Sequence, residues 1–285
     1  IFLGGPVSIA AATQRDAAVR LNLEGRVNID NLRRSAGSPA WAHRLRGAAD
    51  WRGTFVLRNK LADLAIESNL QGIASDLPAP FVKTAAEAVP LRYERKFTGP
   101  QQDQVSFSYG EIVSAQFARS IEGGRSLIRR GTIRFGGAAE EPQRDGVWVS
   151  GVLKAFDLDR WLTLIQPGTG QLPLEVVGLD VRIGEFTALN RRFHEVALSG
   201  TAQGGVWQST LSGREFEGTA TWRPQGRGKL TARMKKLAIP ASEPPPVPPE
   251  GAARKRELPA LDIIAEQFQF KDKALGRLEL VAVPE

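Results

Sequence analysis

The chain of 285 residues contains no cysteine and only two histidines, His43 and His194. The absence of cysteine excludes disulfide bonds and thiolate metal sites, so the fold does not depend on the redox state of its compartment. Neither histidine has the H-x-x-H or H-E-x-x-H spacing of a metal site. His194 instead alternates with Val196 and Leu198, which is typical of a strand. We therefore expect no metal site and no cofactor.

The motifs of several enzyme classes are also missing. The Gly-Gly pairs do not stand in a G-x-x-x-x-G-K-[ST] or a strand–GxGxxG–helix context, and G-x-S-x-G does not occur. Asp157 and Asp159 could form a carboxylate pair, but helix capping and the helix dipole explain both residues at the start of a predicted helix. An enzyme that acts on glycans or peptidoglycan would need paired acids in a cleft, and no spacing supports them. We therefore predict that the protein is not an enzyme.

Long apolar segments are absent as well. No apolar run reaches the roughly 18 residues of a membrane-spanning helix. The chain starts with Ile1, in a segment that reads as a strand, and no signal peptide is visible. We expect a piece of a longer protein, whose membrane anchor would lie outside this sequence.

The charge of the chain is positive. It contains 38 Lys and Arg against 31 Asp and Glu, which gives a net charge of +7. This excess permits an anionic partner such as a lipid headgroup, a nucleic acid or an acidic protein. The arginines are spread along the polar faces of predicted strands and do not form a compact patch with aromatic residues, so we expect no nucleic-acid binding. The basic cluster at 254–256 lies in the Pro-rich segment 240–256, which we interpret as a flexible loop.

Alternation of apolar and polar residues is the main positive signal of the sequence. In residues 62–72 the even positions are apolar or small and the odd positions are mainly polar, which predicts one long, half-buried strand. The two prolines in residues 76–80, DLPAP, then prevent further strand pairing. Residues 17–29 predict a second long strand, in which Gly25 marks a bend or bulge. Residues 51–57 predict a third, joined to the first by a tight hairpin.

The same alternation continues to the end of the chain. After Pro90, it resumes with Leu91, Tyr93 and Arg95, and residues 157–166 predict the clearest helix. We predict a mainly β protein: a long, twisted, mostly antiparallel sheet, curled into an elongated open groove, with one or two short helices. Residues 1–285 would form one elongated segment, with a subdivision near residues 154–172 as the alternative.

An open sheet with few helices would leave its apolar face available to a ligand. An acyl chain gains about 0.8 kcal/mol for each buried CH₂ group, so it suits a long apolar lining. A lipid-conducting segment is our leading hypothesis, and a structural or scaffolding β-domain that binds another envelope protein through the same face is the alternative. The candidate lining residues are Val19, Leu21, Leu23, Phe55, Leu57, Leu64, Ile66, Leu70, Phe107, Val181, Val196, Leu198, Phe216 and Trp222.

Four sequence blocks carry a resemblance to a known family. They read LQGIASDLPAPFVKTA, GVWVSGVLKAFDLDRWL, LNRRFHEVALSG with the following VWQSTL and FEGTATWR, and ELPALDIIAEQFQFKDKALGRLEL. In this order they resemble the central-to-C-terminal part of YhdP-like proteins, which belong to the AsmA superfamily of Gram-negative bacteria. The likeness covers most of residues 51–282. The shared positions read as architecture: Asp76, Leu77, Pro78, Pro80, Trp148, Gly151, Asp157, Trp161, Phe193 and Trp207.

The resemblance implies a function that the residue patterns alone do not establish. The parent would be a large periplasmic protein, anchored in the inner membrane, with an elongated β-groove. It would carry phospholipid between the inner and outer membranes and have no catalytic residues. The implied partners are phospholipid, the membrane through parts of the protein outside this chain, and other envelope proteins.

Overall fold

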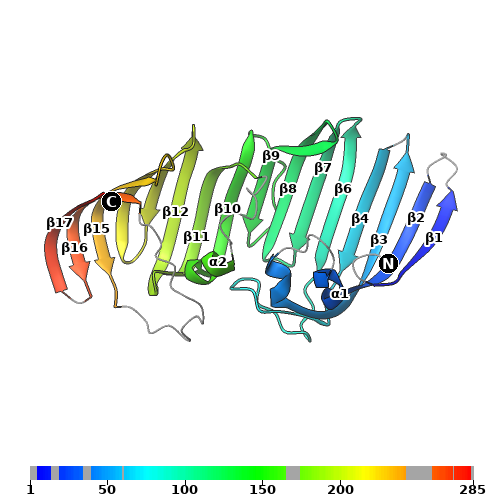
Figure 1. Ribbon diagram of the computed structural model, residues 1–285, viewed down its shortest axis with the longest axis horizontal. Helices are drawn as coiled ribbons and strands as arrows, with labels where there is room; N and C mark the ends of the chain where they lie inside the picture. The colour runs from blue at the N-terminus through cyan, green and yellow to red at the C-terminus, as the bar shows by residue number, and fades with distance from the viewer. Residues whose placement is uncertain are drawn as a thin grey trace. The chain divides into compact units, whose positions relative to one another are not determined.

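The computed structural model describes residues 5–13, 19–34, 40–59, 61–164, 174–241, 259–271 and 273–283. Most of these residues lie in β-strands, and two short α-helices and one 3-10 helix accompany them (Figure 1). The prediction of a mainly β protein with one or two short helices is confirmed. The chain divides into two compact units, the first within residues 1–150 with 166–175 and the second within 151–165 and 176–285.

The first unit is an antiparallel sheet with a small cap of helices. Its strands pair in the order β1–β2–β3–β4–β6–β7–β8–β9, and β5 pairs with the first residues of β3. The bounds are β1 (Val7–Thr13), β2 (Val19–Asn28), α1 (Ile29–Arg34), the 3-10 helix η1 (Ala40–Arg44), β3 (Leu45–Arg58), β4 (Leu61–Ser68), β5 (Ile73–Ser75), β6 (Leu91–Gly99), β7 (Gln102–Tyr109), β8 (Val113–Glu122) and β9 (Arg125–Phe135).

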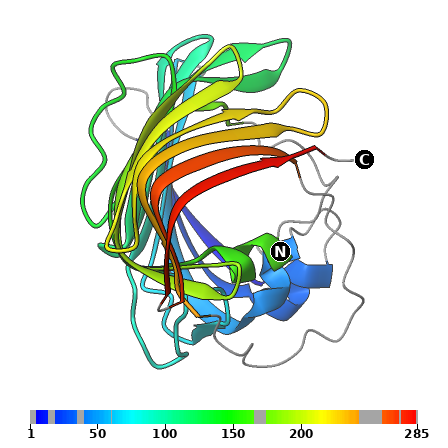
Figure 2. The same ribbon diagram turned by 90° about the vertical axis from the view of Figure 1, so that its left-hand side faces the viewer.

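The second unit is a sheet of consecutive strands with one parallel pair. β15 and β16 are parallel, and the other pairs from β11 to β17 are antiparallel. Figure 2 shows that β15 to β17, coloured orange to red, are bent along their length. The bounds are β10 (Gly146–Asp157), which begins in the first unit, α2 (Leu158–Leu164), β11 (Val176–Ala188), β12 (Arg191–Gln203), β13 (Val206–Ser212), β14 (Phe216–Arg223), β15 (Lys229–Ile239), β16 (Ala260–Phe270) and β17 (Lys273–Ala282).

The Pro-rich segment joins the two parallel strands. Parallel neighbours need a longer connection than a hairpin, because the chain must return to the same end of the sheet. Residues 240–259, which include the Pro-rich segment 240–256, connect β15 to β16. Apart from Pro240 and Ala241, the predicted flexible loop lies outside the described residues, so its flexibility stays a prediction.

The predicted helix is confirmed as α2. The Asp157 carboxylate accepts a hydrogen bond from the backbone N–H of Arg160 at 2.9 Å, which is the N-cap interaction expected. Asp159 has a further role: its carboxylate accepts hydrogen bonds from the backbone N–H groups of Leu189 and Asn190 at 2.9 and 2.8 Å. Both turn residues have a left-handed φ of 54°. Asp159 therefore fixes the turn between β11 and β12.

The prediction of one strand through residue 72 is wrong, because β4 ends at Ser68. The Ser68 hydroxyl donates a hydrogen bond to the backbone oxygen of Asp50 at 2.7 Å and accepts one from the N–H of Leu70 at 3.0 Å. Leu70 has a φ of 52°, so the chain leaves the strand direction there. The prolines at 76–80 instead follow the short strand β5.

A bulge, one of the two features expected at Gly25, is not present. The pairing of β2 with β3 runs without a register shift through Gly25, which lies opposite Trp51. A Cβ atom at Gly25 would lie 2.7 Å from the Trp51 ring. Glycine is present because the indole ring covers the backbone at this point.

Candidate functional site

Apolar side chains align in rows across the first unit. Directly paired residues point to the same face of a sheet. One row joins Leu21, Phe55 and Leu64, and Val19 pairs with Leu57 beside it. The next row contains Leu23, Gly53, Ile66, Tyr93 and Phe107. We call this surface the first apolar face.

The first apolar face is only partly covered by the residues that the structure describes. The side chains of its middle rows are half-buried, and Leu57 is 38% exposed. Towards α1 the face is closed, because Ile29, Ala49 and Ile73 form a buried cluster there. Leu70, a predicted lining residue, packs against this cluster and against the neighbouring one around Tyr109. It is therefore part of the closed end and does not lie in a strand row.

The second unit has a corresponding set of rows, which we call the second apolar face. Val181 and Leu198 begin one row, and Val196 pairs with Ile183 next to it. Trp222 pairs with Trp207 and with Leu230 in another. The first of these rows contains Val181, Leu198, Leu211, Gly218, Met234, Ala265 and Leu278. Its members differ in exposure, since Val181 and Met234 are buried whereas Leu198 and Leu211 are half-buried.

A chain of aromatic rings closes one end of the second apolar face. Trp161 of α2 stacks on Phe156 with 6.4 Å between ring centroids. Phe156 also stacks on Phe186, Phe186 lies tilted against Phe193, and Phe193 meets the predicted lining residue Phe216 edge to face. The centroid separations of these three pairs are 6.3, 6.3 and 5.6 Å. Phe216 also packs against the buried cluster that contains Met234. The sequence did not reveal this arrangement, because the five rings come from elements far apart in the chain.

A charged cluster interrupts the first apolar face near the β6–β7 turn. Arg95 pairs with Leu64 across the strands, and Asp103 pairs with Arg119, so all three charged groups point to the apolar side. The Nε atom of Arg95 donates to Asp103 Oδ2 at 2.6 Å. Arg119 donates to both Asp103 oxygens at 2.7 Å. We call these residues the Arg–Asp–Arg triad.

The triad is buried unevenly. The side chain of Asp103 is 0% exposed, that of Arg119 is 19% exposed and that of Arg95 is 32% exposed. Burial alone would raise the pKa of Asp103, but the hydrogen bonds from Arg119 and Arg95 outweigh it and lower the pKa below its ordinary value. The hydrogen bond to Asp103 raises the pKa of Arg119. The carboxylate therefore stays ionised within the apolar face.

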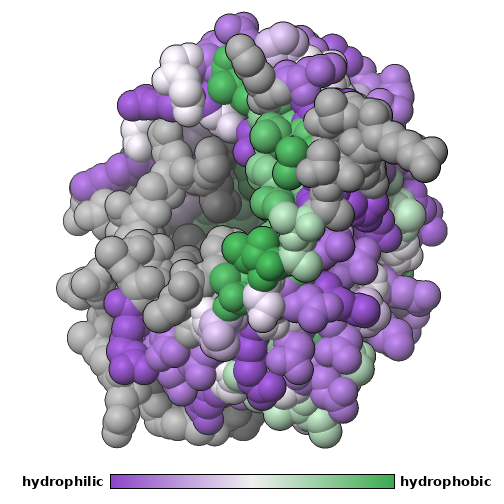
Figure 3. Space-filling view, turned by 90° about the vertical axis from the view of Figure 1, so that its right-hand side faces the viewer, coloured by the Kyte–Doolittle hydropathy of each residue, from purple (hydrophilic) through white to green (hydrophobic). Residues whose placement is uncertain are grey.

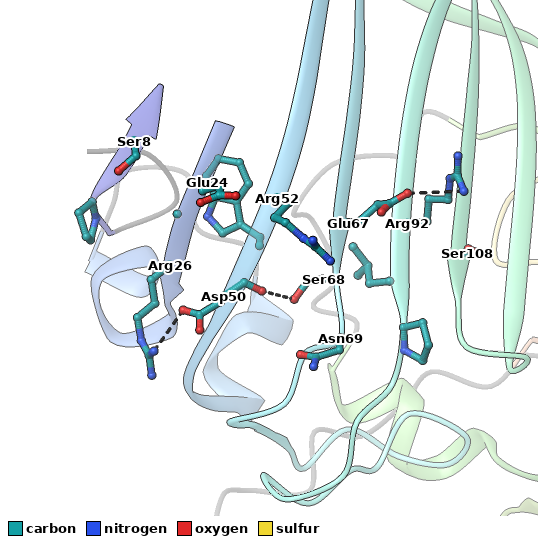
Figure 4. Close-up of a pocket in the computed structure, with 15 residues that line it drawn as sticks. Ser8, Glu24, Arg26, Asp50, Arg52, Glu67, Ser68, Asn69, Arg92 and Ser108 are labelled. Carbon is teal, nitrogen blue, oxygen red and sulfur yellow. Dashed lines mark hydrogen bonds and ion pairs between the residues drawn. The ribbon is translucent and has the colours of Figure 1, made fainter. Parts of the chain in front are cut away.

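The opposite face of the first unit is polar and charged. Glu24, Arg52, Glu67 and Arg92 are successive cross-strand partners of alternating sign. They line an open hollow of about 880 Å³, in which Arg26 also contacts Asp50 at 3.1 Å (Figure 4). Exposed ion pairs of this kind contribute about 0–1 kcal/mol each. The positive and negative charges balance one another. We therefore interpret the hollow as a solvent-exposed row of ion pairs and not as a binding site for a charged ligand.

The described residues show no constellation that points to catalysis. The Nδ1 atom of His194 lies 2.8 Å from a Glu215 carboxylate oxygen, and the other Glu215 oxygen accepts the His194 backbone N–H at 2.8 Å. This pair holds the turn between β13 and β14 against β12. Within the described ranges, no three or more His, Asp or Glu side chains gather into a group that could hold a metal ion. The expectation of a protein without enzymatic activity stays a prediction.

The comparisons with known proteins identify a family. Among the helices that the structure describes, none is long and apolar enough to cross a membrane. The comparisons with curated proteins and with solved structures gave no match. The family model described as YhdP protein matches residues 1–285. The match spans the whole sequence and agrees with the resemblance of the four sequence blocks. The chain therefore belongs to the YhdP family of AsmA-like envelope proteins.

Proposed function

We propose that the chain is a lipid-transfer segment whose apolar faces hold the acyl chains of phospholipid. The observation that carries this proposal is that several residues of the apolar rows are only half-buried. In a sandwich, a second layer would bury such rows completely. Leu64 and Ile66 in the first unit, and Leu198 and Leu211 in the second, instead keep part of their surface accessible.

The surface of the first unit supports an open groove. In the space-filling view of its β1 end, hydrophobic residues gather in one patch, and the rest of the coloured surface is mainly hydrophilic (Figure 3). An acyl chain of roughly sixteen carbons would gain on the order of 10 kcal/mol if a groove of this kind removed it from water. The bent strands of the second unit support the same interpretation for that unit. The curled groove is thus part of the proposal.

Family membership suggests where the segment works. We place it in the periplasm, as part of a protein anchored in the inner membrane through segments outside this chain. The anchored protein would carry phospholipid between the inner and outer membranes. No chemical step is part of this function, because the lipid moves without a change in its covalent structure.

Matched substitutions on the two faces test the proposal. Phe55→Asp places a charge on the first apolar face, and Thr54→Asp places the same charge on the opposite face of the same strand. Burying a carboxylate against acyl chains costs several kcal/mol, and each 1.4 kcal/mol corresponds to about a tenfold change in binding. We expect Phe55→Asp to lower the lipid carried by the intact protein by about tenfold or more, measured by mass spectrometry after extraction. Thr54→Asp should leave the lipid content unchanged.

The second unit allows the same comparison with Leu198→Asp and Ser199→Asp. Leu198 is half-buried in an apolar row, whereas Ser199 is exposed on the other face. Circular dichroism of each variant shows whether the sheet is intact. If folded Phe55→Asp and Leu198→Asp variants carry as much lipid as the parent, these faces do not hold the acyl chains.

A further inference from the structure

We propose that Arg95 binds the phosphate group of a phospholipid whose acyl chains lie on the first apolar face. The proposal rests on the function above and assigns a headgroup site to it. Arg95 lies on β6 close to the β6–β7 turn, at the edge of the sheet opposite to the closed end at α1. A headgroup at this edge would reach water while its acyl chains extend over the apolar rows.

The hydrogen bonds of the triad leave donors on Arg95 but engage Arg119 more completely. Arg119 contacts both oxygens of Asp103 through Nε and Nη2. Arg95 contacts Asp103 only through Nε. Within the described residues, its two Nη atoms form no hydrogen bond or ion pair. The pair of donors that recognises a phosphate is therefore available on Arg95.

Two contacts hold the guanidinium of Arg95 in place. Asp103 accepts from Nε at 2.6 Å, and the guanidinium carbon lies 4.6 Å from the centroid of the Phe97 ring. Asp103 is itself fixed by Arg119 and fully buried. A guanidinium that is oriented before the ligand arrives loses less conformational freedom when it binds.

The charge of the triad favours an anion. Two guanidinium groups face one carboxylate, so one positive charge remains in excess on an otherwise apolar surface. Charge interactions are stronger at such a surface than in water, because the surrounding medium is less polarisable. A phosphodiester at Arg95 would neutralise the excess.

The neighbours of Arg95 identify the rest of the ligand. Arg95 is the direct partner of Leu64, in the row that continues to Phe55 and Leu21. A phosphate at Arg95 therefore places the attached acyl chains over aliphatic and aromatic side chains. Inorganic phosphate would satisfy the charge but would leave this row uncovered. The site thus fits a phosphate ester of a diacylglycerol better than a free anion.

The experiment compares lipids that have the same chains but differ in the phosphate. The intact protein is loaded from vesicles that contain either phosphatidylglycerol or diacylglycerol, and the bound lipid is measured by mass spectrometry. Arg95→Gln should lower bound phosphatidylglycerol by about tenfold, because it removes charge-assisted hydrogen bonds to the phosphate. It should leave bound diacylglycerol unchanged. Arg95→Lys keeps the charge but loses the paired donors, so an intermediate loss of phosphatidylglycerol is expected.

Arg92→Gln is the matched control. Arg92 lies on the same strand but points to the polar face, where it contacts Glu67 at 3.5 Å. This variant should bind both lipids as the parent does. A further arm adds excess inorganic phosphate, which should displace little of the bound phosphatidylglycerol.

The outcomes separate the two proposals. Equal loss of both lipids in Arg95→Gln and Arg95→Lys would show that Arg95 only supports the sheet and would overturn the headgroup site. Unchanged binding of phosphatidylglycerol by Arg95→Gln would overturn the headgroup site as well. It would also be overturned if inorganic phosphate bound as tightly as the lipid and this binding depended on Arg95. A parent protein that binds neither lipid would instead overturn the proposed function, and the headgroup site with it.

Discussion

Asp103 is the residue on which the Arg–Asp–Arg triad depends. Its carboxylate is completely buried and accepts three hydrogen bonds from two arginines. Without its negative charge, two guanidinium groups would face each other on an apolar surface. Removing one partner of a buried ion pair costs about 3–5 kcal/mol. We expect Asp103→Asn to lower the free energy of unfolding by about this amount, measured by urea denaturation.

Asp50→Asn is the control for this substitution. Asp50 pairs with Arg26 at 3.1 Å, but its side chain is 79% exposed. An exposed pair contributes about 0–1 kcal/mol. Equal losses in the two variants would contradict the role given to burial in the triad.

The lowered pKa of Asp103 predicts how the triad responds to acid. A carboxylate can have a lower pKa in the folded protein than in the unfolded chain. Such a carboxylate stabilises the fold at every pH above its pKa in the unfolded chain. This contribution is lost as the pH falls through the lower, folded-state pKa. The ordinary pKa of an aspartate is 3.8. The difference in unfolding free energy between the parent and Asp103→Asn should therefore be constant above pH 3.8. It should shrink as the pH falls below that value. A difference that is the same at every acidic pH would contradict the assignment.

The sequence pattern indicated on which face of their strands Arg95 and Asp103 lie. Arg95 continues the alternation of Leu91 and Tyr93, so it was already placed on the apolar side of its strand. Asp103 has the same relation to Val105 and Phe107. The partnership with Arg119 could not be predicted, because it depends on the register in which β7 pairs with β8.

Among the elements, the connector between β4 and β6 (residues 69–90) is organised by Lys83. Its side chain is buried, and Nζ donates hydrogen bonds to the backbone oxygens of Leu70, Ile73 and Thr84 at 2.9, 2.7 and 3.0 Å. Burial lowers the pKa of Lys83, and Glu87 opposes this shift. The ammonium group thereby ties together both arms of the connector, which closes one end of the first apolar face.

Removing this ammonium group should destabilise the connector. Lys83→Met keeps the apolar stem but removes the ammonium donor of three carbonyl groups, of which the Leu70 oxygen still accepts the backbone N–H of Ile73 at 3.2 Å. An unsatisfied buried group costs about 1–3 kcal/mol. We expect a loss of about 2–4 kcal/mol in the free energy of unfolding. The matched control is Lys96→Met, since the Lys96 side chain is 63% exposed and pairs with Glu94 at the surface. Unchanged stability in Lys83→Met would show that the connector does not depend on these bonds.

Alternation predicted most strands but not all of their ends. Period-two patterns located β2, β3 and β4 because one face of each strand is apolar and the other is polar. The end of β4 was missed because the hydrogen bonds of Ser68 bend the chain before the alternation stops. The parallel pairing of β15 with β16 was missed because local pattern carries no information on strand direction.

At the scale of the whole molecule, each unit has the same construction. Its strands present apolar rows on one face, and a short helix with its neighbours closes one end of that face: α1 in the first unit and α2 in the second. The sequence predicted the two-sided character of the strands and the scarcity of helices. It could not predict which part of each apolar face is covered, because the covering clusters join residues that are distant in the chain.

Site-specific photo-crosslinking shows whether lipid or protein occupies the apolar faces. A benzophenone amino acid is introduced into the intact protein in cells at Leu64 or Leu211, on the apolar faces, and at the neighbouring Ala65 or Thr210 on the polar faces. Our account predicts phospholipid adducts from Leu64 and Leu211 and none from the other two positions. Two results would contradict this account. Equal lipid adducts from all four positions would show that the apolar faces are not special. Protein adducts without lipid from the apolar positions would indicate a scaffolding domain instead.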